Sequence, residues 1–122
     1  MIKSPAQLSE EARKEIPEVS AAEVSAASAD GKYPFLLLDV RELNEFEAGI
    51  IQGATPLPRG LIELTIAKIV QDENAPIVCY CGGGTRSLFA GQQLKRMGFT
   101  NVKSMTGGFK AWIMAGNPVQ KP

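Results

Sequence analysis

Histidine is absent from all 122 residues of the chain. Its absence excludes the catalytic arrangements that depend on an imidazole, among them the Ser-His-Asp triad, the Cys-His dyad, phosphohistidine chemistry and the HExxH metal site. Any nucleophile in this protein must therefore be activated by something other than a neighbouring histidine.

Cysteine is scarce, and long apolar runs are missing. Cys79 and Cys81 are the two cysteines, which neither build a disulfide framework nor, without a second pair or a histidine, a zinc site. We therefore expect no bound metal and no cofactor. No apolar run approaches the length of a membrane span, and the N-terminal segment MIKSPAQLSEEARKEI lacks the apolar stretch of a signal peptide. We expect a cytoplasmic protein that does not bind membranes.

The two parts of the chain differ in charge although the net charge is zero. Residues 1–75 contain 13 acidic and 7 basic residues, whereas residues 76–122 contain 6 basic residues and no acidic one. A positive field over the second part favours an anionic substrate or an acidic partner surface. The alternative is that these are solvated side chains on helix faces. Six basic residues without interleaved aromatic residues do not indicate nucleic-acid binding.

Apolar residues make up 44% of the chain and charged residues 21%, which is typical of one globular domain. Patterning, capping residues and glycine or proline stops predict alternating helices and strands. The predicted helices cover residues 4–15, 20–27, 41–49, 61–70, 87–97 and 109–115. The predicted strands cover residues 35–40, part of 50–58, 76–80 and 101–105. Residues 61–70 also fit a strand, but the spacing of their isoleucines favours a helix. The alternation indicates an α/β fold with a mostly parallel sheet between helices.

The segment CGGGTRS, residues 81–87, lies where a predicted strand passes into a predicted helix. Ligands of parallel sheets bind beyond the carboxyl ends of the strands, which is the position of Cys81. The N–H groups at the start of the following helix, the N–H groups of the loop and the charge of Arg86 can each stabilise a thiolate. Consecutive glycines let these N–H groups wrap around the sulfur, and we expect them to leave a wide opening above it. Cys81 is thus the predicted nucleophile.

Other interpretations of these residues remain open. One alternative is that Cys81 is an incidental residue of a flexible glycine loop. Cys79 lies inside a predicted apolar strand and is expected to be core packing; its alternative role is a resolving thiol, although CxC spacing makes an internal disulfide strained. The loop lacks the GK[ST] of a Walker A motif and does not satisfy GxGxxG.

Three segments in order resemble the single-domain rhodanese, or thiosulfate sulfurtransferase-like, family. They are LLLDVRELNEF (36–46), GIIQGATPLP (49–58), and CGGGTRS (81–87) with the downstream GFTNVKSMTGGFKAW (98–112). The resemblance implies a three-layer fold with a five-stranded sheet. It implies residues 16–122 as the rhodanese-like domain, preceded by residues 1–15 as a helical extension packed on the sheet.

By the same resemblance, Cys81 takes a sulfane sulfur from thiosulfate or a persulfide donor and passes it to a thiol or cyanide. The donor and acceptor are small molecules, and a persulfide on a partner protein is a further donor. The residues expected to bind substrate are Gly82, Gly83, Gly84, Thr85, Arg86 and Ser87. Asp39 and Arg41 are expected near the loop in an ion pair or hydrogen bonds, or alternatively in a purely structural role. Arg59 is expected at the pocket rim.

Two rival functions are considered. The first is a persulfide carrier or regulatory binding module with little turnover. The second is a cysteine phosphatase or arsenate reductase, whose related loops carry one more residue and a histidine before the cysteine; here four residues separate Cys81 from Arg86, and Tyr80 precedes the cysteine. The family's usual histidine after Gly49 is Ile50 in this chain, for which we expect a change in packing.

Overall fold

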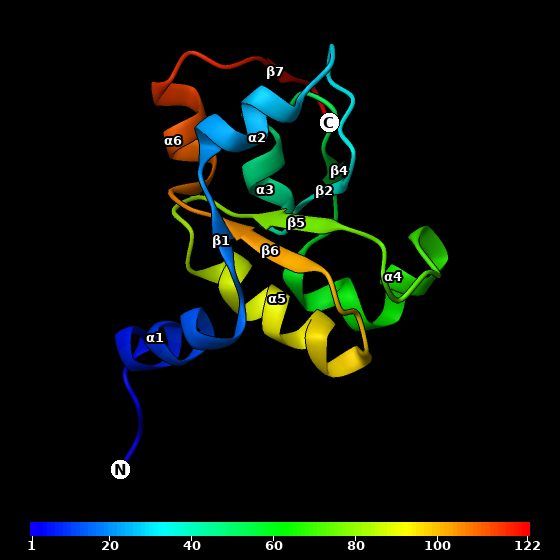
Figure 1. Cartoon of the computed structure of the whole chain (residues 1–122). Coiled ribbons are helices and arrows are strands. Elements are labelled where there is room, and N and C mark those ends of the chain that lie inside the picture. The colour runs from blue at the N-terminus through cyan, green and yellow to red at the C-terminus, as the bar shows by residue number, and fades with distance from the viewer.

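The computed structural model describes residues 1–122 and has a parallel sheet at its centre (Figure 1). The five strands lie in the order β1-β6-β5-β2-β4, and each neighbouring pair is parallel. Their bounds are β1 Glu18–Val19, β2 Leu36–Asp39, β4 Thr55–Pro56, β5 Ile77–Tyr80 and β6 Val102–Met105. The predicted five-stranded α/β fold is therefore confirmed.

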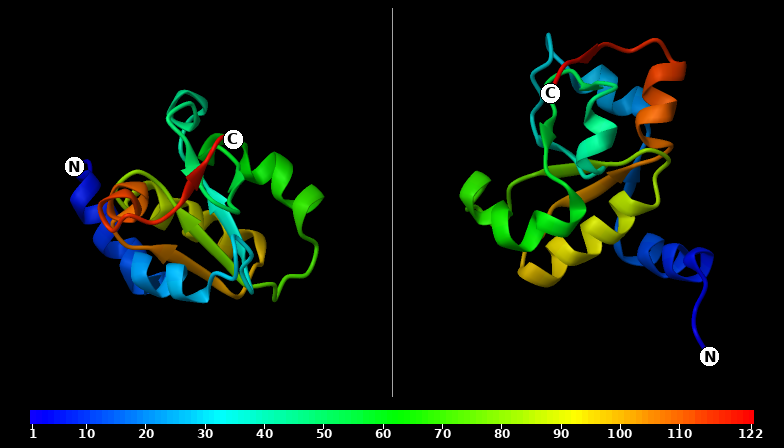
Figure 2. Two further views of the ribbon diagram at one scale, coloured as in Figure 1. Left: turned by 90° about the horizontal axis from the view of Figure 1, so that it is seen from above. Right: turned by 180° about the vertical axis from the view of Figure 1, so that it is seen from behind.

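Helices cover both faces of the sheet, as the view from behind shows (Figure 2). One layer consists of α2 Ala21–Ala27, α3 Leu43–Phe46 and α6 Gly108–Met114. The other consists of α4 Ile62–Ile69, which follows the short 3₁₀ turn η1 Arg59–Leu61, and α5 Arg86–Met97. Alternation along the strands divides the core: Leu37 and Val78 pack toward the first layer, whereas Leu38 and Cys79 pack toward the second.

Local signals in the sequence fix several helix ends. Ser4 caps α1, Pro5–Glu15, and Ser20 caps α2; each hydroxyl accepts from the N–H three residues later in a complete capping box. Gly98 ends α5 in the left-handed region, with φ of 115°. The predicted helix in residues 61–70 is confirmed by α4. These elements position the loop between β5 and α5.

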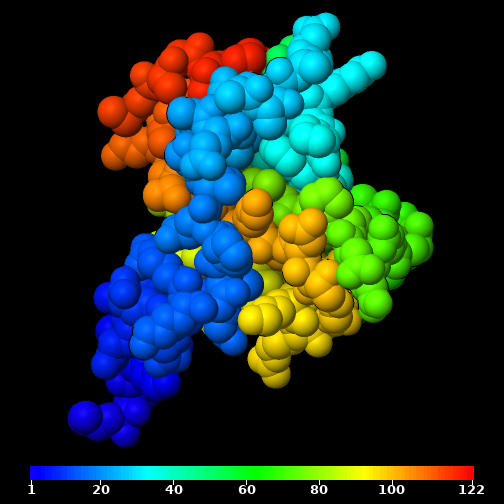
Figure 3. Space-filling view, viewed as in Figure 1, coloured from blue at the N-terminus to red at the C-terminus, as the bar shows by residue number.

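The N-terminal helix lies against α5 and not against the sheet, which corrects the expected position of the extension. Ala12 and Ile16 are buried with Leu88 of α5. A Cβ at Gly91 would lie 2.9 Å from Ile16 Cγ2, so the absence of a side chain on α5 permits this close approach. The first residues of the chain project away from the body of the molecule (Figure 3).

Two short pairings were not predicted from the sequence. Residues after Pro17 form the edge strand β1, which pairs with β6. Near the other terminus, β7 Val119–Gln120 pairs antiparallel with β3 Ile50–Ile51, both beside the first layer of helices. No helix of the structure has the length and apolar character required to cross a bilayer.

Candidate active site

The CGGGTRS loop begins directly after β5 and passes into the first turn of α5, as the sequence predicts. The N-terminus of α6 holds its outer side: Phe109 N–H donates to the Cys81 carbonyl at 2.7 Å, and Lys110 N–H donates to the Gly82 carbonyl at 3.1 Å. Gly108 makes this approach feasible, because a Cβ there would lie 2.3 Å from the Cys81 carbonyl oxygen. The sequence motif GGFKAW therefore supports the loop from a different part of the chain.

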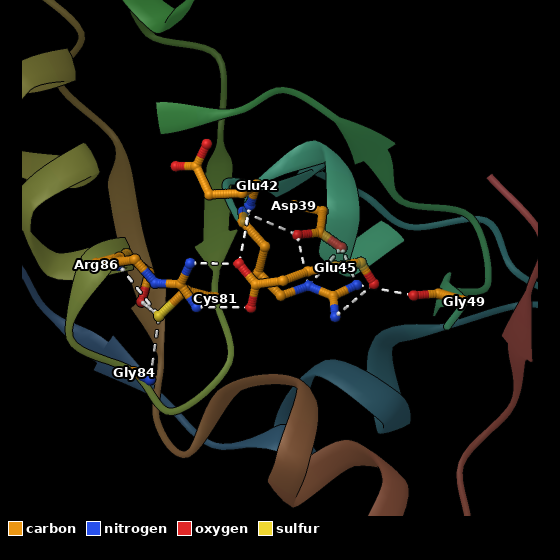
Figure 4. Close-up of polar contacts among 9 residues, drawn as sticks. Asp39, Glu42, Glu45, Gly49, Cys81, Gly84 and Arg86 are labelled. Atoms are coloured by element: carbon orange, nitrogen blue, oxygen red, sulfur yellow. Dashed lines mark hydrogen bonds and ion pairs between the residues drawn. The ribbon is translucent and has the colours of Figure 1, made fainter. Parts of the chain in front are cut away.

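Backbone N–H groups and one hydroxyl converge on the sulfur of Cys81. Gly84 N–H donates to Sγ at 3.1 Å, Ser87 N–H donates at 3.4 Å, and the Ser87 hydroxyl lies 3.5 Å away (Figure 4). Gly84 has φ of 106°, a conformation that favours glycine and turns its N–H toward the sulfur. The Ser87 N–H is one of the unpaired groups at the start of α5. The predicted arrangement of loop and helix N–H groups around the sulfur is present.

These contacts favour the thiolate form of Cys81. Burial alone raises the pKa of the thiol, but the Ser87 hydroxyl and the backbone N–H groups of Ser87, Gly84 and Gly83 outweigh it, and the pKa lies below its ordinary value. Cys79, by contrast, has no exposed surface, and burial raises the pKa of its thiol to about 12. Cys79 is therefore core packing, and the pKa values of the two thiols shift in opposite directions because only Cys81 lies among hydrogen-bond donors.

Arg86 closes the loop and makes an ion pair that the sequence did not predict. Its guanidinium makes a two-pronged ion pair with Glu45 of α3, at 2.5 and 2.9 Å (Figure 4). The bond with Arg86 lowers the pKa of Glu45 to about 2, and the same bond raises the pKa of Arg86. The second part of the chain has no acidic residue of its own, yet α3 brings one from the first part. The charge of Arg86 is thus already paired with a carboxylate, and its role in supporting the thiolate or binding substrate stays a prediction.

The wide opening predicted above the sulfur is wrong, because Cys81 is only 1% exposed. The N–H groups of α6 bond the carbonyls of Cys81 and Gly82, and the Arg86 side chain is held by Glu45. Gly83 is exposed, and nothing lies within 4 Å of the position of a Cβ there. The free space of the loop therefore lies on the side of Gly83. Gly82 instead faces Arg86, whose Nη2 would be 3.1 Å from a Cβ.

Asp39 and Arg41 form an ion pair, which is deeply buried and not exposed. The guanidinium of Arg41 donates to both Asp39 carboxylate oxygens, with a shortest distance of 2.8 Å, and to the Gly49 carbonyl (Figure 4). Tyr80 O–H donates to the same carboxylate at 2.6 Å. Burial raises the pKa of Tyr80, so its hydroxyl stays protonated. These bonds join β2, β5 and the segment before β3, which favours the structural alternative for this pair.

Arg59 lies beside α5, with its guanidinium 5.6 Å from the centre of the Phe89 ring. It lines a surface hollow with residues of η1, α4, α5 and the segment before α3; these are Glu42, Gly60, Glu63, Phe89 and Gln93. Its contacts are thus with the outer face of the helix that follows the loop. A role of Arg59 at the rim stays a prediction.

Sequence reasoning missed two functional neighbours of the loop. Glu45 was part of a motif but was not assigned as the partner of Arg86, and Ser104 of β6 lies 2.8 Å from the Ser87 hydroxyl. Both contacts join residues far apart in the chain. The acidic residue expected near the loop was Asp39 and not Glu45, and a serine inside a strand carries no signal by itself. No group of three or more metal-binding side chains lies together in the structure.

Comparison with known protein families identifies the family of this chain. The family model of the Rhodanese-like domain matches residues 20–115, which is most of the chain. The protein therefore belongs to the rhodanese-like domain family, as its three motifs predict. A relative from Allochromatium vinosum named sulfurtransferase is 33% identical over 105 residues, covering 86% of this chain and 95% of the relative.

Solved structures show the same fold. The chain matches a Rhodopseudomonas palustris protein of unknown function, described as a possible tyrosine phosphatase, with a TM-score of 0.90, 30% identity and coverage of 98% of this chain and 96% of that one. A thiosulfate sulfurtransferase from Pseudomonas aeruginosa matches with a TM-score of 0.78 and 28% identity over 91% of this chain and 21% of that one.

Several relatives are considerably longer than this chain. The chain spans 59% and 55% of two proteins from Bacillus subtilis and 47% of one from Synechocystis. Family membership and the sulfurtransferase relatives support a role in sulfur transfer for this protein.

Proposed function

We propose that the protein is a sulfurtransferase that carries a sulfane sulfur on Cys81, taken from thiosulfate or a persulfide donor and passed to a thiol or cyanide. The observation that carries this proposal is the convergence of Gly84 N–H, Ser87 N–H and the Ser87 hydroxyl on one sulfur atom. Groups of this kind stabilise the Cys81 thiolate, which is both the nucleophile of the first step and the leaving group of the second. The chain reaches this state without a histidine base.

The reaction proceeds in two displacements at sulfur. The Cys81 thiolate attacks the outer sulfur of the donor, forms an S–S bond and expels the rest of the donor with the electron pair of the broken bond. That leaving group is sulfite from thiosulfate, or a thiolate from a persulfide. The acceptor then attacks the outer sulfur of the Cys81 persulfide, and the Cys81 thiolate leaves. No net oxidation of the enzyme occurs over the cycle.

The surroundings of the loop favour a persulfide over thiosulfate as the donor. Arg86 is paired with Glu45, and Gly82 and Gly83 offer no side chain to bind a sulfonate. A persulfide needs no such cation, because it delivers its outer sulfur and leaves as a thiolate. The exposed surface at Gly83 is the side from which that sulfur can reach the loop.

The same loop argues against phosphoryl transfer. Four residues separate Cys81 from Arg86, and two loop N–H groups already bond the sulfur itself. A phosphate-sized anion requires donors directed at its own oxygens, above the sulfur. Arg86 is also paired with Glu45, so its charge is already neutralised by a carboxylate.

Steady-state turnover tests the proposal. Wild type, Cys81→Ser and Cys79→Ser are assayed with thiosulfate or glutathione persulfide as donor and with cyanide or a thiol as acceptor. We expect turnover in wild type and Cys79→Ser, faster with the persulfide, and none in Cys81→Ser. A single turnover without further cycles identifies the carrier or regulatory module instead. Hydrolysis of a phosphate ester that depends on Cys81, without sulfur transfer, contradicts the proposal.

A further inference from the structure

Two buried serine hydroxyls lie in line behind the sulfur of Cys81. Ser87, in the first turn of α5, has its Oγ 3.5 Å from Cys81 Sγ. The Oγ of Ser104, inside β6, lies 2.8 Å from that of Ser87. Both serines are fully buried. Sulfur, Ser87 and Ser104 thus form a short chain of hydrogen-bonding groups that leads from the loop to strand β6 of the sheet.

The two hydroxyl protons of Ser87 and Ser104 are the number needed for the two hydrogen bonds of this series when Cys81 is a thiolate. A thiolate only accepts, so Ser87 gives it its single proton, and the bond between the two serines then uses the proton of Ser104. The Ser104 hydroxyl makes its side-chain hydrogen bond with the hydroxyl of Ser87. When Cys81 is a thiol, the three groups have three protons but only two hydrogen bonds between them. One buried donor is then left without an acceptor among these groups. Unpaired buried donors are destabilising.

We propose that Ser104 is a positioning residue for sulfur transfer, which donates to Ser87 and thereby fixes the Ser87 hydroxyl as a donor to the Cys81 thiolate. Ser104 touches neither the sulfur nor a substrate and acts through Ser87 alone. Donation from Ser104 also polarises the Ser87 hydroxyl, because hydrogen bonds in a chain strengthen one another in a medium of low dielectric. The inference rests on the proposed function, since it concerns the nucleophile and leaving group of that reaction.

The charged and titratable neighbours do not take over this role. Arg86 on α5 and Cys79 on β5 are the titratable groups that interact with the Cys81 charge. Arg86 is held by Glu45 of α3, and Cys79, with a pKa of about 12, stays neutral at ordinary pH. Hydroxyl and backbone donors therefore provide the stabilisation of the thiolate, and Ser104 extends the side-chain part of it.

A titration of the Cys81 thiolate by its ultraviolet absorbance tests the proposal without any sulfur donor. All proteins carry Cys79→Ala, so that one thiol remains. We expect Ser87→Ala to raise the pKa of Cys81 by about one unit or more, because a hydrogen bond to a charged group is lost. We expect Ser104→Ala to raise it by a few tenths of a unit, at roughly 10–30% of the strength of the bond. In the double variant, the pKa should equal that of Ser87→Ala.

Two further variants complete the experiment. Ser104→Thr keeps the hydroxyl and should leave the pKa of Cys81 unchanged, whereas Ser9→Ala removes a buried hydroxyl of α1 and should also have no effect. The proposal is overturned if Ser104→Ala leaves the pKa unchanged, or if its effect persists when Ser87 is alanine. Because no sulfur donor is present, these outcomes are independent of whether the protein transfers sulfur, which the turnover assay decides.

Discussion

Replacing Glu45 with glutamine removes the charge that holds Arg86 at the active loop. In the folded protein the pKa of Glu45 is lowered from 4.5 to about 2, chiefly by its bond to Arg86. A difference of that size corresponds to about 3 kcal/mol at most. The two side chains are 33% and 31% exposed, so solvent screens part of the interaction. We therefore expect Glu45→Gln to lower the free energy of unfolding by about 1–2 kcal/mol at neutral pH.

The loss of stability caused by Glu45→Gln should depend on pH. A carboxylate whose pKa is lower in the folded state contributes its full stability above its unfolded pKa, and the contribution disappears as the pH falls toward the folded pKa. The difference between wild type and Glu45→Gln should thus be constant above pH 4.5 and shrink as the pH falls toward about 2. Urea unfolding at a series of pH values measures it.

Glu47→Gln is the matched control, since Glu47 is an exposed carboxylate just after the same helix. It should change the free energy of unfolding by less than about 0.5 kcal/mol at every pH. The reasoning fails if Glu45→Gln has no larger effect than this control. It also fails if the loss caused by Glu45→Gln stays the same from neutral to acidic pH, since the cause is then not the ion pair.

Three other substitutions test the support of the loop and its choice of donor. Gly108→Ala should inactivate the protein and lower the free energy of unfolding by more than about 1–3 kcal/mol, because its Cβ meets the active loop. Gly116→Ala has a similar positive φ but open space around it, so it should lose only the energy of backbone strain. Thermal unfolding and turnover compare the two variants. Asp39→Ala should cost about 3–5 kcal/mol in chemical unfolding, because it leaves the guanidinium of Arg41 buried without a partner, and a loss below 1 kcal/mol contradicts this. Gly83→Lys should raise kcat/KM for thiosulfate about two- to fivefold and leave kcat/KM for glutathione persulfide unchanged, because it adds a cation that can bind a sulfonate. Gly83→Met should change neither value. If both variants have the same effect, the lack of a cation is not what limits thiosulfate as a donor.

The fold was predictable where the cause is local. The N-cap at Ser4, the capping box at Ser20, the stop at Gly98 and the apolar strand before Cys81 each depend on a few neighbouring residues, and the structure contains all four. The edge strand β1 and the pairing of β3 with β7 are two residues long per strand, so no periodicity reveals them. Their partners lie far away in the sequence.

The site was predictable in its backbone and less so in its side chains. The position of Cys81 between strand and helix, and the N–H groups around it, follow from the order of elements and the glycines. The pairing of Arg86 with Glu45 and of Ser87 with Ser104 depends on how α3 and β6 pack beside the loop. The narrow access to the sulfur was missed for the same reason, because the N-terminus of α6 lies across the loop.

The central claim is that Cys81 carries a transferable sulfur. Its most direct test is the intact mass of reduced wild type, Cys81→Ser and Cys79→Ser after incubation with glutathione persulfide or thiosulfate and removal of the excess. We predict one added sulfur on wild type and Cys79→Ser, none on Cys81→Ser, and loss of the added sulfur when a thiol acceptor is supplied. An unchanged mass of the wild type with both donors, or an added sulfur that persists in Cys81→Ser, contradicts the account.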